Sequence, residues 1–391
     1  MSASCTIQDV FNRFYQNYEK KHALSVAQRK AAYHIMNCKT GAFGINVSVC
    51  EECGCISVHY NSCRDRCCPM CQEFPKEKWV DARREDVLDA PYFHVVFTVP
   101  EELNPIIYSN QKLLYDALYH ASSDTLRELA SDSKYLGADI GYICILHTWG
   151  SKMNFHPHIH AVVLGGGLDS ENRWKNNGEE FFLPIRVVSR LFRGKYLAEL
   201  KQLWKDSKLE FHGSAERFKN HYAFKELLDS CYGKEWVPYC KKPFDGAESV
   251  IRYLGKYTHR IAISNYRIKA VTDSSVTFIA KDYKTHGQWK EVTLSGEEFL
   301  RRFLMHVPPK RFVRIRHYGL LSSRNKNRKI TLCRNLLGCR KYLSRLKDLD
   351  APSIIRILYN KDVCKCSFCG GKIIPLNAEQ YVIRPDPYLL C

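Results

Sequence analysis

The chain has 391 residues, of which 45% are apolar and 12% aromatic, so it is a globular protein of two or three domains and not a disordered one. Lysine and arginine number 59 against 41 aspartates and glutamates, and the net charge of +18 favours a polyanionic partner, most commonly nucleic acid. No run of about 18 apolar residues exists, so we expect no membrane span. The first ten residues lack a signal-peptide pattern, and we expect a reducing, cytoplasmic setting.

Cysteines cluster near the start of the chain. The sequence has 18 of them, and in a reducing setting such clusters indicate metal binding more than disulfides. Cys50 and Cys53 form one C-x2-C knuckle, and Cys68 and Cys71 form another. Each knuckle places two thiolates on one tight turn, and four thiolates satisfy the tetrahedral preference of zinc. We therefore predict a structural zinc ion held by these four residues.

Further cysteines leave two alternatives open. Four of them lie near the knuckles: Cys38, Cys55, Cys63 and Cys67. They either complete a second zinc site or are small buried residues. In the tail, the pattern Cys364-x-Cys366-x2-Cys369 suggests another zinc knuckle, with Cys333 or Cys339 as its fourth ligand.

The central part of the chain alternates strands and helices. Runs of β-branched and aromatic residues predict strands at 92–99, 140–148 and 158–164, and apolar residues at helical spacing predict helices at 111–130 and 187–209. Four later segments read as antiparallel strands: 260–264, 267–271, 276–281 and 289–294. This mixed order with hairpin-like segments predicts an α+β sheet domain and not a doubly wound one.

Two histidines open the strand predicted at 158–164. Side chains alternate along a strand, so His158 and His160 point to the same face about 7 Å apart and can share one metal ion. A third ligand must come from elsewhere, and His156, His94 and His259 are the candidates. The alternatives are a structural zinc site or a pair of exposed histidines, but in a basic protein we favour a catalytic metal.

A helix predicted after Pro243 carries two tyrosines at helical spacing. Tyr253 and Tyr257 are four residues apart and share one helix face. Three basic residues form a row about 100° away: Arg252, Lys256 and Arg260. Two phenolic hydroxyls beside a cationic stripe suit attack on a DNA phosphate, with the stripe contacting the flanking strand. The spacing by itself fits ordinary buried tyrosines better.

These blocks, in this order, resemble the two-tyrosine rolling-circle transposases of insertion sequences of the IS91 type, over nearly the whole chain. The zinc knuckle of that family is similar to YNSCRDRCCPMCQ at 60–72, and its tyrosine helix to YCKKPFDGAESVIRYLGKYTHRIAISNYRI at 239–268. Four more blocks match: FHVVFTVPEELN at 93–104, LHTWG at 146–150, HPHIHAVVLGGGL at 156–168 and FLRRFLMHVPPKRFVRIRHYGLL at 299–321.

The resemblance implies an HUH-type nuclease fold, in which a central antiparallel sheet carries two histidines on its middle strand. It implies that His158 and His160 bind the catalytic ion and that Tyr253 and Tyr257 are the nucleophiles. Phosphoryl transfer favours Mg²⁺ or Mn²⁺ as that ion, and imidazole ligands favour Mn²⁺ somewhat. Each tyrosine would keep the 5′ phosphate of a cut strand and free a 3′ hydroxyl. The partner implied is DNA, mainly single-stranded transposon ends and target, in the nucleoid of a prokaryotic cytoplasm.

We expect three consecutive segments: a zinc-binding domain at 1–88, a catalytic domain at 89–318 and a basic tail at 319–391. A replication initiator or plasmid relaxase would use the same chemistry, but the zinc module and the tail knuckle argue against it. A zinc-dependent DNA-binding regulator without catalysis would explain the cysteines and the charge. It would not explain the histidine strand or the paired tyrosines. The sequence leaves the oligomeric state open.

Overall fold

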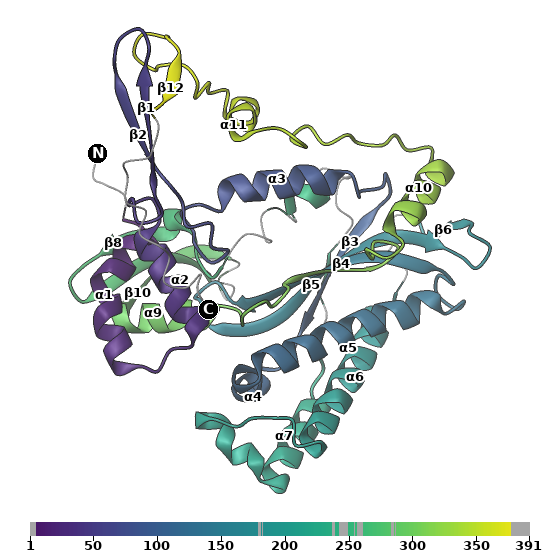
Figure 1. The fold of residues 1–391 in the computed structure, drawn as a ribbon. Coiled ribbons are helices and arrows are strands. Elements are labelled where there is room, and N and C mark those ends of the chain that lie inside the picture. Colours follow the sequence, from purple (N-terminus) through teal and green to yellow (C-terminus); the bar gives the residue numbers. More distant parts are fainter. Residues whose placement is uncertain are drawn as a thin grey trace. The chain divides into compact units, whose positions relative to one another are not determined.

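The computed structural model describes residues 5–178, 181, 183–236, 239–241, 249–253, 255, 261–282, 285 and 287–376. The chain forms two compact units, each built from segments distant in sequence (Figure 1). Unit 1 contains Met1–Ala82, His259–Val307 and Ser344–Cys391, and unit 2 contains Arg83–Thr258 and Pro308–Leu343. This division differs from the three consecutive segments that we expected, because most of the tail shares a unit with the N-terminal cysteines.

Unit 2 is built around an antiparallel sheet whose strands follow the order β11-β4-β5-β3-β7, with β6 added to β5. Its strands are β3 (Tyr92–Thr98), β4 (Asp139–Trp149), β5 (Phe155–Leu168), β6 (Trp174–Asn176), β7 (Tyr239–Lys241) and β11 (Ile315–Gly319). The α+β prediction and its three central strands are confirmed. The middle strand of the sheet is β5, which pairs antiparallel with β4 on one side and β3 on the other.

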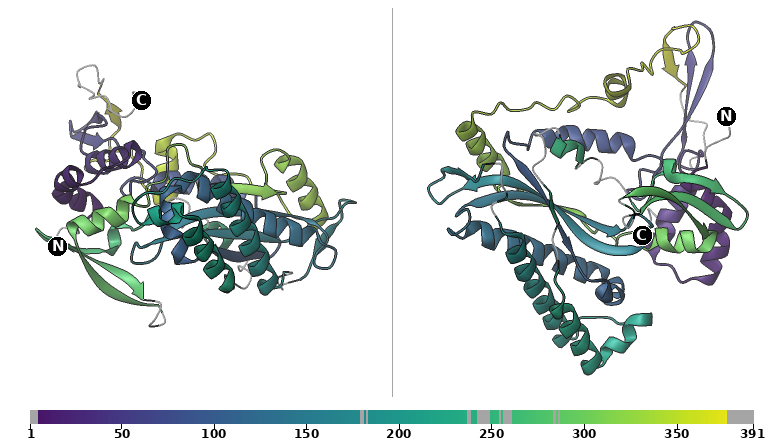
Figure 2. Two further views of the ribbon diagram at one scale, coloured as in Figure 1. Left: turned by 90° about the horizontal axis from the view of Figure 1, so that it is seen from below. Right: turned by 180° about the vertical axis from the view of Figure 1, so that it is seen from behind.

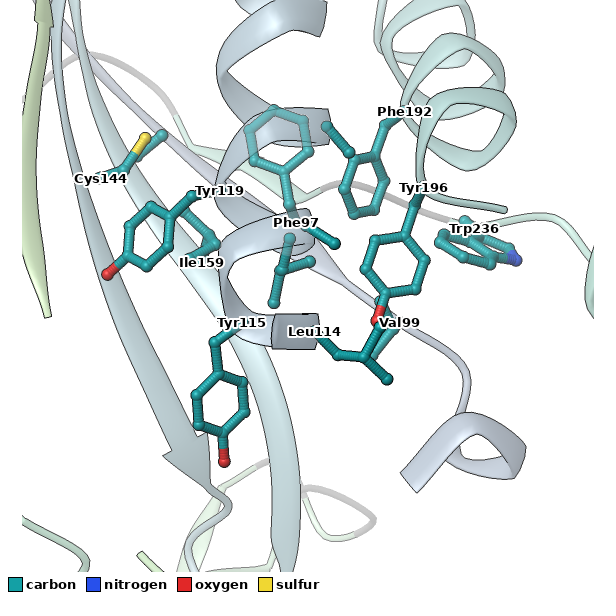
Figure 3. Close-up of a cluster of buried hydrophobic side chains, with 14 of the residues drawn as sticks. Phe97, Val99, Leu114, Tyr115, Tyr119, Cys144, Ile159, Phe192, Tyr196 and Trp236 are labelled. Atoms are coloured by element: carbon teal, nitrogen blue, oxygen red, sulfur yellow. The ribbon is translucent and has the colours of Figure 1, made fainter. Parts of the chain in front are cut away.

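Helices cover one face of this sheet. The long helices are α5 (Gln111–Ser131), as predicted, and α6 (Ile185–Lys205), which ends four residues before the predicted end. Shorter elements of the unit are η1 (Glu101–Leu103), α4 (Asn104–Ser109), η2 (Gly213–Lys219), α7 (His221–Gly233) and α10 (Lys326–Leu337). Figure 3 shows Phe97, Cys144 and Ile159 of the three central strands among aromatic side chains of α5 and α6. Burial of this face drives the sheet and helices together.

Because strand side chains alternate, the residues between these core positions point to the other face of the sheet. On β5, the core contains Ile159, Ala161 and Val163. His158 and His160 therefore lie on the face opposite α5 and α6.

Unit 1 joins the N-terminal helices to a segment about 260 residues further along. The helices α1 (Ile7–Lys21) and α2 (Val26–Asn37) each begin with a capping box, at Thr6 and Ser25. The later segment forms η3 (Asn265–Arg267), a sheet of β8 (Ile268–Val271), β9 (Ser275–Asp282) and β10 (Gln288–Ser295), and α9 (Gly296–Leu304). The rings of Phe11 and Phe303 pack edge to face at 5.2 Å. This apolar contact places the segment with α1 in unit 1.

The strand predicted at 260–264 is wrong over its described residues, since 261–264 form no strand. Ala262 has a φ of 45°, which an extended strand cannot accommodate. The other three strands of that series are confirmed as β8, β9 and β10.

The remaining part of unit 1 carries the cysteine knuckles. A hairpin of β1 (Ile45–Cys50) and β2 (Ile56–Tyr60) is extended by β12 (Ile373–Pro375) from the tail, in the order β12-β1-β2. The helix α3 (Glu73–Arg84) follows the hairpin, and the helix α11 (Ala351–Tyr359) precedes β12. Figure 2 shows these elements from two further sides. Of the helices in the described part of the chain, none combines the length and apolar character needed to cross a membrane.

Candidate active site and metal centres

Strand register brings four histidines to the face of the unit 2 sheet opposite α5 and α6. The pairing of β4 with β5 sets His147 directly across from His158. The pairing of β3 with β5 sets His94 across from Val162, which lies two residues after His160 on the same face of β5. All four side chains are buried, with 2–9% of their surface exposed.

Three of these histidines are arranged to share a metal ion. One ring nitrogen each of His147, His158 and His160 lies within 4.8 Å of the others, and the Nε2 atoms of His158 and His160 are 3.0 Å apart. Two nitrogens bound at right angles to one ion at about 2.1 Å would stand about 3.0 Å apart. The geometry therefore fits a divalent cation, and His147, which we had not considered, supplies the third donor.

The ring of His156, our candidate third ligand, is not part of this group. The backbone of His156 instead orients one of its members. The carbonyl of His156 accepts a hydrogen bond from His158 Nδ1 at 2.6 Å. The protonated nitrogen of His158 is thereby fixed as Nδ1, which leaves the lone pair of Nε2 facing His160. His259, another candidate, lies outside the described residues.

Burial keeps the imidazoles of His158 and His160 neutral. Loss of hydration, followed by the positive charge that His156 would carry, lowers the pKa of His158 to about 3. Burial, with the neighbouring His147 and His158, lowers the pKa of His160 well below its usual value. A neutral imidazole offers the lone pair that a metal requires, so the rings are in the binding form at neutral pH.

Tyr253 approaches the histidine group from a described helical stretch at 249–253. Its hydroxyl lies 2.5 Å from His94 Nε2 and 2.8 Å from His160 Nδ1, and these two nitrogens are 2.8 Å apart. His160 therefore faces His158 with Nε2 and the tyrosine with Nδ1. Arg252, the residue directly before Tyr253 on this helix, is exposed. Three predicted site residues lie outside the described residues: Tyr257, Lys256 and Arg260.

In unit 1, one group of four cysteines lies inside the N-terminal module. The sulfur atoms of Cys38, Cys63, Cys68 and Cys71 all lie within 4.8 Å of one another, and those of Cys63 and Cys71 are 3.7 Å apart. Four sulfurs bound at about 2.3 Å to one zinc ion stand about 3.8 Å apart. The group thus fits a tetrahedral zinc ion, with Cys38 and Cys63 in the places that we had assigned to Cys50 and Cys53.

Hydrogen bonds hold this cysteine group in place. Cys38 is the C-cap of α2, and the side-chain amide of Gln8 on α1 lies within 3.0 Å of three carbonyls at that helix end, including that of Cys38 at 2.9 Å. Asp65 accepts from the Cys67 N–H at 2.7 Å and contacts His34 Nδ1 at 2.9 Å. Burial raises the pKa of Asp65, but the bonds from His34 and Cys67 outweigh it and the net pKa is lowered.

The thiols of this group interact strongly. Hydrogen bonds from Cys63, Cys68 and Cys71 lower the pKa of Cys38, while sharing a proton with Cys38 raises the pKa of Cys68. One thiolate is favoured at the expense of its neighbours, because several negative charges cannot gather in so small a space unaided. A cation is what allows all four to ionise together.

Cys50 and Cys53, the other predicted knuckle, lie apart from Cys68 and Cys71. Their sulfur atoms group with those of Cys366 and Cys369 from the tail. The single site that we predicted from the two N-terminal knuckles is therefore two groups. Neither group includes five further cysteines that we had considered: Cys55, Cys67, Cys333, Cys339 and Cys364.

Comparison with known proteins identifies the family. A family model described as a putative transposase matches residues 141–329, and one described as a transposase zinc-binding domain matches residues 10–99. The putative transposase y4qJ of Sinorhizobium fredii (strain NBRC 101917 / NGR234) is 43% identical over 97% of this chain and 96% of that protein. The chain belongs to the IS91-type transposases.

A second transposase extends this relationship. The transposase for insertion sequence element IS801 of Pseudomonas savastanoi pv. phaseolicola is 28% identical over 96% of this chain and 90% of that protein. A solved structure, of the conjugative relaxase TrwC in complex with oriT DNA without metal, covers 42% of this chain and 70% of that chain at 14% identity. Its TM-score of 0.25 is too low to carry an argument. The cysteine groups of this transposase and its zinc-binding domain support structural zinc.

Proposed function

We propose that this transposase nicks and rejoins single-stranded DNA at insertion-sequence ends through 5′-phosphotyrosine intermediates, in rolling-circle transposition. The observation that carries the proposal is the position of the Tyr253 hydroxyl, within 2.8 Å of His94 Nε2 and His160 Nδ1. His160 also belongs to the three-histidine group. A phenol held beside metal-ligand side chains is suited to attack a phosphate bound at the same place.

The three-histidine group is proposed as the catalytic metal site. It offers three nitrogen donors and leaves further coordination positions open, as catalytic sites require. A bound Mg²⁺ or Mn²⁺ would polarise the phosphate and shield its charge. Imidazole ligands favour Mn²⁺ over Mg²⁺. The four-thiol groups offer no open position, so we assign the chemistry to the histidines.

His94 is proposed as the base that takes the tyrosine proton. Because His160 turns Nε2 toward the metal-site histidines, its Nδ1 carries the hydrogen and can donate to Tyr253 Oη. The hydroxyl can in turn donate to His94 Nε2. This matters because a free phenol, with a pKa near about 10, is a poor nucleophile at neutral pH.

The cleavage step then balances as follows. The Tyr253 Oη–phosphorus bond forms while the bond from phosphorus to the 3′ oxygen breaks, and the phenolic proton moves to His94 Nε2. The released 3′ oxygen takes a proton from water and becomes a hydroxyl. Attack of a 3′ hydroxyl on the phosphotyrosine reverses these bond changes and rejoins a strand.

Further residues are assigned by the resemblance to the family and by helical spacing. Tyr257, one turn after Tyr253, would act on the second strand. Arg252, Lys256 and Arg260 would contact phosphates of the flanking DNA. Membership of a transposase family favours transposition over the related chemistry of plasmid replication or conjugation.

A cleavage assay tests the proposal. Full-length protein is incubated with single-stranded DNA carrying an element end, with Mg²⁺, Mn²⁺ or a chelator. We expect cutting with either ion and none with the chelator. The double variant Tyr253→Phe/Tyr257→Phe should bind the DNA without cutting it. If the parent protein binds the DNA and never cuts it, the chain acts as a DNA-binding regulator instead.

A further inference from the structure

The N-terminal hairpin and the tail segment before β12 share a second group of cysteine sulfurs in unit 1. Cys50 and Cys53 belong to the N-terminal hairpin, and Cys366 and Cys369 lie 313 to 319 residues later. The sulfurs of Cys50 and Cys369 are 3.4 Å apart, and those of Cys53 and Cys366 are 3.8 Å apart. We propose that these four thiolates bind one zinc ion, which joins the tail of the transposase to its N-terminal module.

The two halves of this site have the same backbone design. Residues 50–54 read CEECG and residues 366–370 read CSFCG. In each, the N–H of the first cysteine donates to the carbonyl five residues later, at 3.0 and 2.8 Å, and the glycine N–H donates to the carbonyl of the first cysteine, at 3.0 and 2.9 Å. Gly54 and Gly370 both have positive φ, of 69° and 80°, which favours glycine. Each half is thus a preformed turn presenting two thiols.

Backbone pairing brings the two halves of the site together. The tail strand β12 pairs antiparallel with β1, with Cys50 opposite Ile373. The N–H of Glu51 donates to the carbonyl of Lys372 at 3.0 Å. At Gly371 an added Cβ would stand 3.0 Å from Cys50 Sγ, so the bare backbone allows this close approach.

The chemistry of the donors selects the ion. Four thiolates at tetrahedral spacing suit zinc, and they do not suit Mg²⁺ or Ca²⁺, which prefer oxygen ligands. An all-thiolate shell has no open position, so the role of the ion is structural. A link between residues so far apart removes much of the freedom of the unfolded chain.

A shared zinc ion would make the N-terminal module depend on two cysteines of the tail. The match to the transposase zinc-binding domain covers residues 10–99 and so contains only Cys50 and Cys53 of this site. The alternative is a separate tail site, in which Cys366 and Cys369 bind metal together with Cys364. In the structure Cys364 is exposed and outside the group, and it serves as a matched control.

Zinc content of full-length variants tests the assignment. We expect Cys366→Ser to lose one zinc equivalent relative to the parent, and Cys364→Ser to lose none. In the hairpin, Cys53→Ser should lose one and Cys55→Ser none. The double variant Cys53→Ser/Cys366→Ser should again lose one equivalent, since both residues serve the same ion. Loss of two equivalents in the double variant, with one in each single variant, would overturn the proposal.

Thiol labelling of the unmodified protein gives a second test that does not depend on how variants fold. Peptide mapping after alkylation should find four cysteines protected together and released together by a chelator: Cys50, Cys53, Cys366 and Cys369. Cys55 and Cys364 should react at once. Labelling of Cys366 and Cys369 as fast as Cys364, before the chelator is added, would contradict a shared site.

Discussion

The histidine group of unit 2 and the cysteine groups of unit 1 differ in how many coordination positions they would leave open on a bound ion. Each cysteine group offers four thiols, which complete a tetrahedral shell, whereas the histidine group offers three nitrogens and has the Tyr253 hydroxyl beside it. These three histidines stand on two neighbouring strands of one sheet, β4 and β5, and the pairing of the strands fixes their spacing. The cysteines stand on turns and helix ends. Ions bound there would hold unit 1 together, while an ion on the histidines would act on a substrate.

The largest effect is expected from removing a cysteine ligand. Cys68→Ser should lose one zinc equivalent and the cooperative thermal unfolding of unit 1, because structural zinc contributes about 10–16 kcal/mol in small zinc domains at neutral pH. Zinc analysis and circular dichroism measure this. Cys67→Ala, at a buried neighbour outside the group, is the control and should keep its zinc. If the Cys68→Ser protein retains all its zinc, this cysteine group does not bind a structural zinc ion through Cys68.

Removing a histidine ligand should affect chemistry and leave the fold intact. His160→Ala should lower the rate of DNA cleavage by about 10³-fold, which corresponds to about 4 kcal/mol of transition-state stabilisation. DNA affinity should change little, because it comes mainly from phosphate contacts elsewhere. His156→Ala is the matched control, since alanine keeps the carbonyl that orients His158. Equal losses of binding and cleavage in His160→Ala would point to a structural site.

Replacing His94, the proposed base for Tyr253, should slow DNA cleavage less than loss of His160 does, and the loss should depend on pH. His94→Gln can still hydrogen bond but cannot take a proton, and should slow cleavage by about 10²-fold at neutral pH. The deficit should shrink as pH rises toward the phenol pKa of about 10, because hydroxide then removes the proton. Rates measured from pH 7 to pH 9 check this. A constant ratio of variant to parent rates at every pH would show that His94 only positions the tyrosine.

The smallest effect, on the free energy of unfolding, is expected from removing the hydrogen bonds that Gln8 makes to the helix end beside the cysteine group. Gln8→Ala removes the amide that bonds the end of α2, and should lower the free energy of unfolding by about 1–2 kcal/mol. Zinc content should remain that of the parent. Urea unfolding measures the change, with exposed Lys20→Ala on the same helix as the control. A change of similar size in both variants would remove the special role given to Gln8.

Local patterns were enough to predict the elements of the sheet and the common face of two histidines. Alternation along β5 depends on neighbouring residues alone, so His158 and His160 could be paired from sequence. The third member could not, because His147 reaches the group through the register of β4 against β5, which is a long-range property. The contact between His94 and Tyr253 also depends on tertiary packing.

Long-range strand pairing also explains why the prediction of one zinc site from the two N-terminal knuckles was wrong. Spacing suggested that the two nearest knuckles share one ion, but pairing of β12 with β1 brings Cys366 and Cys369 to Cys50 and Cys53. A signal was present in the repeated C-x2-C-G pattern at 50–54 and 366–370. It identifies two similar knuckles without saying that they meet.

Covalent capture of the protein–DNA intermediate identifies the nucleophile. Full-length protein is mixed with single-stranded DNA carrying an element end and a divalent ion, digested, and searched by mass spectrometry for peptides joined to a 5′ phosphate. We expect an adduct on Tyr253 or Tyr257 that is absent with a chelator and absent from the double Phe variant. An adduct on another residue, or one that forms at the normal rate in the double Phe variant, would contradict it.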